Sequence, residues 1–461
     1  VSVQQQATLF QAKPLEYRIP ALLYIEKYRT ILAFAEHRGG ARDESADQIV
    51  MRRGTYDETK YTVQWEKMQT IVEKPLGDHR PMSPCPVYDE VTGNVVLVFI
   101  AVEGTVSEQV QLDKKENKTR LCQVTSADNG VSWGPVKDLT DTDTGSNDKT
   151  WATFAVGPGH SFQLNEDKSL VIPAYAYWIL DDNTPSPHSF CFVRSDNDHG
   201  KTWRRGNYLA LNSGECQMVE LKSQGKSVLY CNSRSKEKVR VQAVSDNKGR
   251  DFKNHDFVSK LVESSSQGCH GSVIGFPRPA GVQSEEDTKW LFSPDLFLHN
   301  KPYSKGCFLC RIQTETFTGA AGLLRELFET IDLVYPQKNR SDEVHHLEPA
   351  SLGEKVSWEH HIPAFSDGRR GAPEQDTWVL YSHPTSSEER KDLGLYLNKE
   401  PLNPESWMKP TVICQGFCSY SDLQYMGPGP EGSPLFCCLF EFGKKSECEK
   451  IIFFMFTLKD V

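Results

Sequence analysis

Three arginines stand in short segments that are typical of strands or strand ends. They are Arg18 in "YRIP", Arg234 in "NSRS" and Arg390 in "ERKD". A guanidinium group is planar and stays charged at any relevant pH, so clustered arginines can hold a carboxylate through paired hydrogen bonds. The spacing also fits three unrelated surface cations, each of little energetic weight. A carboxylate-binding pocket is therefore one of two interpretations that these residues allow.

A glutamate and a tyrosine extend the chemistry that such a pocket could perform. Glu215 lies in "GECQ" and Tyr420 lies in "SYSD", both within strand-rich segments. A buried carboxylate beside a phenol can accept its proton and make the oxygen a nucleophile. Taken alone, the two residues are equally compatible with structural roles.

Short apolar runs provide the elements that must position these residues. Examples are "NVVLVFIAV" (94–102), "SLVIPAYAY" (169–177), "PLFCCLFEF" (434–442) and "KIIFFMF" (450–456). They are rich in β-branched and aromatic residues and are separated by Gly, Asp, Asn and Lys turns, which is typical of strands. We predict an all-β fold.

One turn motif recurs along the chain. It reads "SADNGVSW" (126–133), "DNDHGKTW" (196–203) and, in a degraded form, "SDNKGRDF" (245–252). In a hairpin, the Asp or Asn bonds its own turn backbone, the Gly takes a positive φ and the aromatic residue anchors the turn to the sheet. Similar hairpins spaced tens of residues apart indicate repeated sheets, and hence a β-propeller.

The sequence changes in character between residues 277 and 375. Apolar residues recur at helical spacing over 324–331, and Pro336 closes that stretch. We predict one domain over 1–461, in which 277–375 form a long, partly helical insertion.

Composition and charge exclude some classes of function. The net charge is -10, so we expect no nucleic-acid partner, and an anionic ligand must meet a local arginine cluster. The apolar runs are shorter than the roughly 20 residues that cross a bilayer. No signal-peptide pattern opens the sequence, so we do not expect secretion by this route. Thirteen scattered cysteines favour reduced thiols in the cytosol.

A zinc site is conceivable within the 277–375 segment. Cys307 and Cys310 lie there, as do the adjacent histidine pairs 345–346 and 360–361. A tetrahedral site needs four convergent ligands, which adjacent His-His pairs rarely provide. We favour free thiols and loop histidines, and we predict neither a metal nor a cofactor.

Several motifs together resemble a known family. "YRIPALLY", "LAFAEHR", "VIPAYAY", "SHPTS" and "YSDLQ", with the repeated turns, look like the vertebrate sialidases of the cytosolic and plasma-membrane group. The resemblance covers nearly the whole chain outside 277–375. It implies a six-bladed β-propeller and exo-α-sialidase activity.

The resemblance also implies roles for individual residues. Arg18, Arg234 and Arg390 would grip the sialic acid carboxylate, Tyr420 would be the nucleophile with Glu215 as its base, and Asp43 would be the acid/base. The remaining expected contacts are Glu36, which would hold Arg18; Arg38 and Met82, on the N-acetyl or O4 side; Glu108, Tyr175 and Tyr177, at the glycerol and N-acetyl groups; and Gln267, in the pocket wall.

Two residues depart from the family pattern, and the assignment of one strand needs a choice between two stretches. Ser83 stands where the family usually has Asn, and His270 stands where it has Gln, so we expect altered affinity or specificity with catalysis retained. Two similar stretches, 285–296 and 374–385, compete for one blade strand. Because Arg390 must lie one turn beyond that strand, we assign the strand to 376–384.

The resemblance gives expectations for substrate and location. Within the family, the chain looks more like the plasma-membrane, ganglioside-preferring branch. We therefore expect sialylated glycolipids, glycoproteins and oligosaccharides as substrates and peripheral attachment to the plasma membrane. The alternatives are a soluble cytosolic sialidase with broad substrates and a non-catalytic propeller that binds sialic acid as a lectin. The oligomeric state is left open.

Overall fold

The fold is all-β in the part of the chain that the structure, a computed structural model, describes: residues 1–11, 16–140, 149–194, 202–223, 226–279 and 376–458. Contacts place all of the described residues in one compact unit. Residues 280–375, which hold nearly all of the predicted insertion and its candidate zinc ligands, lie outside the described residues. The helical elements described are α1 (Glu108–Lys114) and 3-10 turns at Glu26–Tyr28, Asp43–Ser45, Pro404–Ser406 and Pro430–Gly432.

Four sheets have the size of single propeller blades. One contains β2 (Glu16–Ile25), β3 (Thr30–Arg38), β4 (Ala46–Asp57), β5 (Thr62–Trp65) and β6 (Gln69–Glu73), and the next contains β7 (His79–Asp89), β8 (Asn94–Glu103), β9 (Thr119–Ser126) and β10 (Lys137–Asp138). The third contains β11 (Trp151–Val156), β12 (Phe162–Gln163), β13 (Leu170–Ile179), β14 (Pro185–Arg194) and β15 (Trp203–Arg205), and the fourth β16 (Cys216–Ser223), β17 (Lys226–Ser233), β18 (Val239–Ser245) and β19 (Lys253–Val262).

The fifth sheet has seven strands, so the described residues do not form the six separate sheets that we expected. The reason is β23, one continuous strand that pairs with β22 through residues 411–417 and with β24 through residues 417–428, with register shifts in both pairings. The strands of this fifth sheet are, in order, β1 (Ser2–Phe10), β25 (Lys450–Thr457), β24 (Pro434–Gly443), β23 (Thr411–Pro428), β22 (Lys391–Asn398), β21 (Thr377–Pro384) and β20 (Ser272–Pro277). The position of β21 confirms the strand predicted over 376–384.

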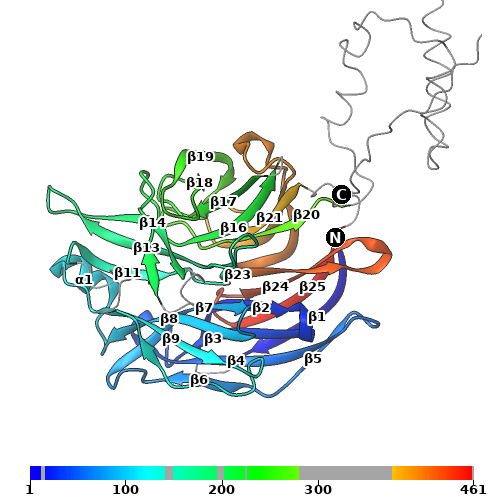
Figure 1. Ribbon diagram of the computed structural model, residues 1–461, viewed down its shortest axis with the longest axis horizontal. Helices are drawn as coiled ribbons and strands as arrows, with labels where there is room; N and C mark the ends of the chain where they lie inside the picture. Colours follow the sequence, from blue (N-terminus) through cyan, green and yellow to red (C-terminus); the bar gives the residue numbers. More distant parts are fainter. Residues whose placement is uncertain (12–15, 141–148, 195–201, 224–225, 280–375, 459–461) are drawn as a thin grey trace, which may run out of the picture. The chain divides into compact units, whose positions relative to one another are not determined.

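The sheets follow one another around a common centre (Figure 1). β2 contacts both β7 and β23, while β16 contacts β13 and β20, so the last sheet returns to the first. β1 pairs antiparallel with β25 and thereby joins the two ends of the chain.

Asp422 ties several sheets together at this centre. Its fully buried carboxylate accepts hydrogen bonds from the backbone N–H groups of Leu22 (2.7 Å) and His160 (2.8 Å). It also accepts from Gln217 Nε2 (3.1 Å) and Ser272 Oγ (2.9 Å). Since a buried carboxylate is costly unless its oxygens are paired, these bonds fix the part of β23 that directly follows Tyr420.

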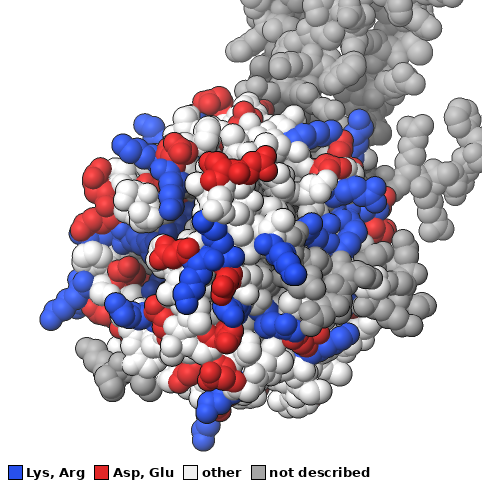
Figure 2. Space-filling model, turned by 90° about the vertical axis from the view of Figure 1, so that its left-hand side faces the viewer, with Lys and Arg blue, Asp and Glu red and all other residues white. Residues whose placement is uncertain are grey.

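The surface drawn in Figure 2 carries Lys and Arg side chains interspersed with Asp and Glu, and neither sign dominates that face. An anion approaching this face therefore meets no broad basic area. Among the described residues, the helices are too short or too polar to cross a membrane.

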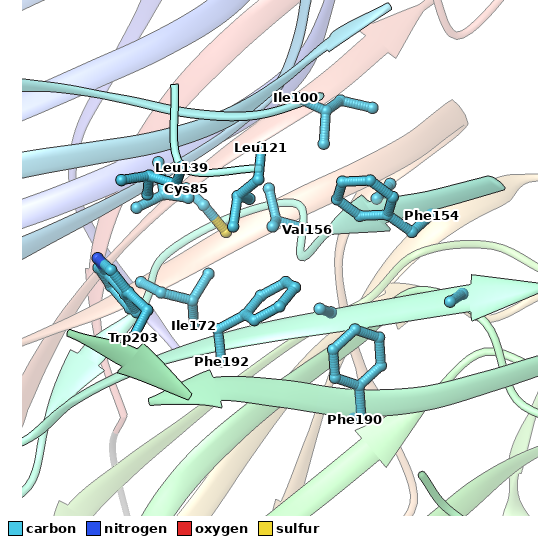
Figure 3. Packing of buried hydrophobic residues seen from close by; sticks show 14 of the residues in the cluster. Cys85, Ile100, Leu121, Leu139, Phe154, Val156, Ile172, Phe190, Phe192 and Trp203 are labelled. Atoms are coloured by element: carbon cyan, nitrogen blue, oxygen red, sulfur yellow. The ribbon is translucent and has the colours of Figure 1, made fainter. Parts of the chain in front are cut away.

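A large aromatic cluster packs between the β7–β10 sheet and the β11–β15 sheet (Figure 3). Phe190 and Phe192 meet edge to face at 5.0 Å between ring centroids, and Trp151 lies 5.4 Å from Phe154. Such contacts add to the free energy gained by burying the rings. The eleven described cysteines are all free thiols.

Two of the repeated turns have the predicted geometry. In the first, the N–H of Gly130 donates to Ser126 Oγ (2.8 Å), and the N–H of Ser132 donates to Asp128 (2.9 Å). Gly130 has φ 84°, and Trp133 packs against Phe34 at 5.9 Å between ring centroids. The turn over 245–252 repeats the same bonds. Most of 196–203 lies outside the described residues.

Candidate active site

A pocket of about 350 Å³ gathers the predicted site residues, apart from Tyr177 and Gln267. Residues far apart in the sequence meet here because the inner ends of several sheets converge. The predicted residues that line it are Arg18, Glu36, Arg38, Asp43, Met82, Glu108, Tyr175, Glu215, Arg234, Arg390 and Tyr420.

The three predicted arginines surround Tyr420. The guanidinium carbons of Arg18 and Arg390 each lie 5.7 Å from the centroid of its ring. Arg234 Nη1 donates a hydrogen bond to the Tyr420 hydroxyl (3.1 Å). Arg18 comes from β2, Arg234 directly follows β17 and Arg390 directly precedes β22. These cations are therefore not unrelated surface charges, because the fold brings them to one pocket.

Glu441, which our sequence reasoning missed, holds Arg18. Its buried carboxylate accepts from Arg18 Nε (2.7 Å) and Nη2 (3.2 Å) and from the backbone N–H groups of Ile19 (2.8 Å) and Tyr420 (3.2 Å). The prediction that Glu36 holds Arg18 is wrong. A lone carboxylate within the apolar run "PLFCCLFEF" was the available signal, because buried charges need partners.

A distortion of β2 accompanies this arrangement. Ile19 has φ 58°, and the pairing of β2 with β3 shifts register between Arg18 and Ala21. A positive φ is strained for a β-branched residue and persists only where its surroundings hold it. The bond from the Ile19 N–H to Glu441 is one such restraint.

Tyr420 and Glu215 form the central pair of the pocket. The phenol donates to Glu215 Oε1 at 2.5 Å, and Arg234 Nη1 donates to Glu215 Oε2 at 2.6 Å. Burial and the Glu215 charge raise the pKa of Tyr420 well above its ordinary value, while Arg234 and Arg390 oppose that rise. The resting site thus holds a neutral phenol beside a carboxylate that can accept its proton.

Asp43 lies at the mouth of the pocket, bound to Arg38. Arg38 Nη1 donates to Asp43 Oδ1 (2.6 Å), and its Nε and Nη2 donate to Glu36 Oε2 (3.0 and 2.6 Å). The Asp43 side chain is 64% exposed, whereas those of Glu36 and Arg38 are buried. Asp43 is therefore accessible to water, and its bond to Arg38 holds it beside the pocket. The backbone N–H of Ser83 donates to Glu36 Oε1 (2.7 Å), so this residue contributes through its main chain.

Glu108 and Tyr175 line another wall of the pocket, and Tyr177 lies beside Tyr175 outside the lining. Glu108 begins α1, and its carboxyl accepts from the Tyr175 hydroxyl (3.4 Å). Tyr177 is two residues further along β13, on the same face. Although Glu108 is exposed, desolvation by the pocket around its carboxyl and the charge of Glu215 raise its pKa to about 7. This side of the pocket gains negative charge as the pH rises through neutrality.

The remaining predicted residues occupy lesser positions. Met82 packs against the aromatic cluster at the pocket edge. The Gln267 side chain is exposed, and its carbonyl accepts from Arg234 Nε (2.9 Å). His270 is buried with its ring centroid 5.3 Å from that of Tyr420, and burial lowers its pKa to about 3. His270 is therefore neutral beside the central pair. The described residues include no cluster of three or more His, Cys, Asp or Glu arranged to hold a metal.

The propeller gathers three arginines around a tyrosine-glutamate pair, an arrangement suited to binding a carboxylate-bearing ligand. Comparison with known proteins identifies the family. The BNR repeat-like domain family matches residues 29–273. The chain is 42% identical to Sialidase-4 of Mus musculus, covering 100% of this chain and 94% of that protein. It is 42% identical to Sialidase-2 of Mus musculus (99% and 96%) and 38% identical to Sialidase-3 of Rattus norvegicus (100% and 96%).

Solved structures agree on the fold. A Hadza microbial sialidase superposes with a TM-score of 0.62 at 18% identity, over 97% of this chain and 66% of that one. A Trypanosoma rangeli sialidase in complex with 2,3-difluorosialic acid, captured as a covalent intermediate, has a TM-score of 0.54 at 13% identity (95% and 53%). The chain belongs to the sialidase family, whose members are exo-α-sialidase glycosidases.

Proposed function

We propose that this protein removes terminal α-linked sialic acid from glycans with retention of configuration, using Tyr420 as the nucleophile. The observation that carries the proposal is the 2.5 Å bond between Tyr420 and Glu215 within the arginine pocket. Proton NMR of the released sugar tests it, because a retaining enzyme yields the α-anomer before mutarotation. First appearance of the β-anomer would refute the mechanism.

The choice of a phenol follows from the charge of the substrate. Sialic acid carries its carboxylate on the anomeric carbon, so a carboxylate nucleophile would approach a like charge. Tyr420 is neutral until Glu215 takes its proton, and this repulsion is avoided. Sialidases with a tyrosine nucleophile are a known exception to the two-carboxylate scheme of glycosidases.

The reaction then has two steps. The arginines bind the carboxylate, Tyr420 attacks the anomeric carbon as Glu215 accepts the phenol proton, and Asp43 protonates the departing glycosidic oxygen. In the second step Asp43 accepts a proton from water, which attacks the same carbon and releases Tyr420, reprotonated by Glu215. Two inversions give net retention.

Asp43→Asn provides a test of the acid role. Protonation of the departing oxygen matters most for a poor leaving group, so kcat for sialyllactose should fall about a hundredfold or more. For an aryl sialoside, whose phenol leaves without protonation, the rate of the first step should fall much less. Rates for both substrates in wild type and variant measure this difference. Equal losses on the two substrates would remove Asp43 from that role.

Glu108 predicts a pH dependence of substrate binding. Its pKa of about 7 means that the carboxyl ionises between pH 6 and 8, adding negative charge beside the bound anion. KM should therefore rise roughly threefold or more over this range in the wild type. In Glu108→Gln, KM should stay level over the same range. A variant with the same rise as the wild type would show that another group titrates.

The proposal extends to sialylated glycolipids as substrates and to peripheral attachment at the plasma membrane. Its support is the likeness of the sequence motifs to the ganglioside-preferring branch. Ganglioside and sialyllactose turnover, compared side by side, tests the substrate, and carbonate extraction of membranes tests the location. Equal preference and a wholly soluble protein would favour the alternative cytosolic enzyme.

A further inference from the structure

A single stretch of backbone, segment 267–269, contacts two of the three pocket arginines. Its three carbonyl oxygens accept, in chain order, from Arg234 Nε (2.9 Å), Arg390 Nη2 (2.9 Å) and Arg240 Nη1 (2.7 Å). The first two arginines line the pocket and the third lies buried behind it. Any displacement of this segment would therefore turn two guanidinium groups at once.

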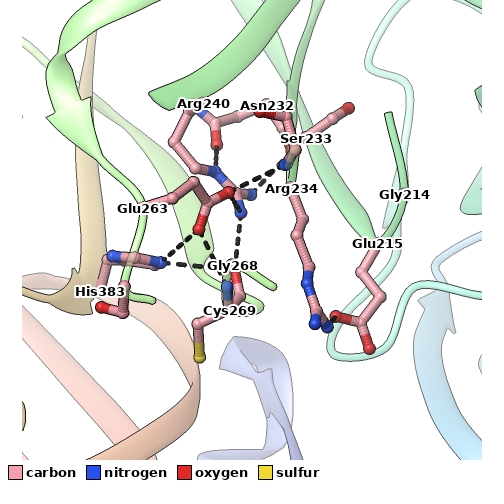
Figure 4. A network of polar contacts seen from close by, with 12 residues as sticks. Gly214, Glu215, Asn232, Ser233, Arg234, Arg240, Glu263, Gly268, Cys269 and His383 are labelled. Carbon is pink, nitrogen blue, oxygen red and sulfur yellow. Dashed lines mark hydrogen bonds and ion pairs between the residues drawn. The ribbon is translucent and has the colours of Figure 1, made fainter. Parts of the chain in front are cut away.

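Glu263 fixes both this segment and the backbone beside Arg234 (Figure 4). Its Oε2 accepts from the Cys269 N–H (2.9 Å), and its Oε1 accepts from the Ser235 N–H (3.0 Å). Arg240 Nη1 lies 3.0 Å from Oε1, and His383 Nε2 lies 3.2 Å from Oε2. The three charged or titratable side chains of this cluster are fully buried.

The packing leaves the segment little room to shift. Gly268 has φ 69°, and a Cβ there would lie 2.7 Å from the Ser235 carbonyl oxygen and 3.0 Å from Glu263 Oε2. Within the described residues, the pocket lining includes neither Glu263 nor Arg240 nor His383. The cluster can therefore act on a ligand only through the arginines it supports.

We infer that Glu263, held by Arg240 and His383, is a positioning residue that orients Arg234 and Arg390 for binding the substrate carboxylate. This inference rests on the proposed function of the pocket. Both oxygens of Glu263 are needed, because each accepts one backbone N–H and one side-chain donor. An amide in its place would turn an NH₂ group toward donors.

The test uses Glu263→Gln and two ligands that differ only in the carboxylate. The first is 2-deoxy-2,3-didehydrosialic acid and the second is its carboxamide. We expect the Kd of the acid to rise roughly ten- to a hundredfold, because its charge-assisted bonds lose their geometry. The Kd of the carboxamide should change less than about twofold, because it makes no such charged pair.

Asp89→Asn is a matched control. Asp89 has a buried carboxylate that pairs with Arg194 at 2.5 Å. Among the described residues, Asp89 is not part of the pocket lining. This variant should lower thermal stability and leave the ratio of the two Kd values unchanged. A change of that ratio in the control would mean that loss of stability alone explains the effect, which would overturn the inference.

Two further variants keep the outcome decisive. If Glu263→Gln does not fold, Gly268→Ala displaces the same segment without removing a charge and should give the same selective loss. Equal weakening of both ligands, or no weakening, overturns the inference. If Arg390→Ala also leaves the ratio of the two Kd values unchanged, the pocket does not bind the carboxylate through its arginines. In that case the proposed function and the inference are both wrong.

Discussion

Replacing Tyr420 by phenylalanine should lower kcat for sialoside hydrolysis by roughly 10³- to 10⁶-fold, the scale seen when a nucleophile is removed. Phenylalanine keeps the ring that lies against Arg18 and Arg390, so the pocket should retain its shape. It lacks the hydroxyl that Glu215 deprotonates. Measurement of kcat with a fluorogenic sialoside, together with the Kd of an inhibitor, separates lost chemistry from lost binding.

Tyr381→Phe is the matched control for this substitution. Tyr381 is buried, and its hydroxyl has no hydrogen-bond partner in the structure. Its removal should change kcat less than about twofold, because no described interaction is lost. Retention of more than a tenth of wild-type kcat by Tyr420→Phe would contradict the assignment. Binding without turnover in the wild type would favour the lectin alternative.

Arg390→Ala is expected to have the second large effect. In the described structure its side chain donates only to neutral oxygens, Ser419 Oγ (3.1 Å) and the Gly268 carbonyl (2.9 Å). Its charge is therefore available to a ligand, and its removal leaves no carboxylate unpaired. KM should rise roughly ten- to a hundredfold, the value of one or two charge-assisted bonds, with little change in Tm. Steady-state kinetics and thermal unfolding measure the two quantities.

Arg18→Ala should behave differently, although both residues belong to one arginine cluster. Removing Arg18 leaves Glu441 buried without its ion partner, which typically costs about 3–5 kcal/mol of folding free energy. The two backbone N–H donors to Glu441 reduce this cost. We therefore expect a lower Tm together with a higher KM. A stable Arg18→Ala and an unstable Arg390→Ala would contradict this distinction.

Local chemistry explains what the sequence predicted well. The strands follow from β-branched and aromatic runs, and the turns at 126–133 and 245–252 follow from their own Ser and Asp or Asn side chains and from a Gly with positive φ. The strand over 376–384 was chosen because Arg390 had to follow it, and it is β21. Each of these predictions depends on residues within a few positions of one another.

Long-range geometry explains what the sequence could not provide. Tyr420 and Glu215 are 205 residues apart, so their contact depends on closure of the ring of sheets; only the family resemblance pointed to it. The resemblance implied Glu36 as the partner of Arg18; Glu36 is opposite Arg18 in register but pairs with Arg38, while Glu441 reaches Arg18 from β24. The seven-stranded sheet depends on β23 running as one strand that pairs with β22 and then with β24, which the sequence pattern does not indicate.

The most direct test of the central claim is to trap the covalent intermediate. The protein is treated with 2,3-difluorosialic acid, digested and mapped by mass spectrometry, with Tyr420→Phe in parallel. We expect one sialyl adduct, on the peptide that carries Tyr420, and no adduct in the variant. An adduct on Glu215 or another residue, or hydrolysis that continues in Tyr420→Phe at the wild-type rate, would contradict it.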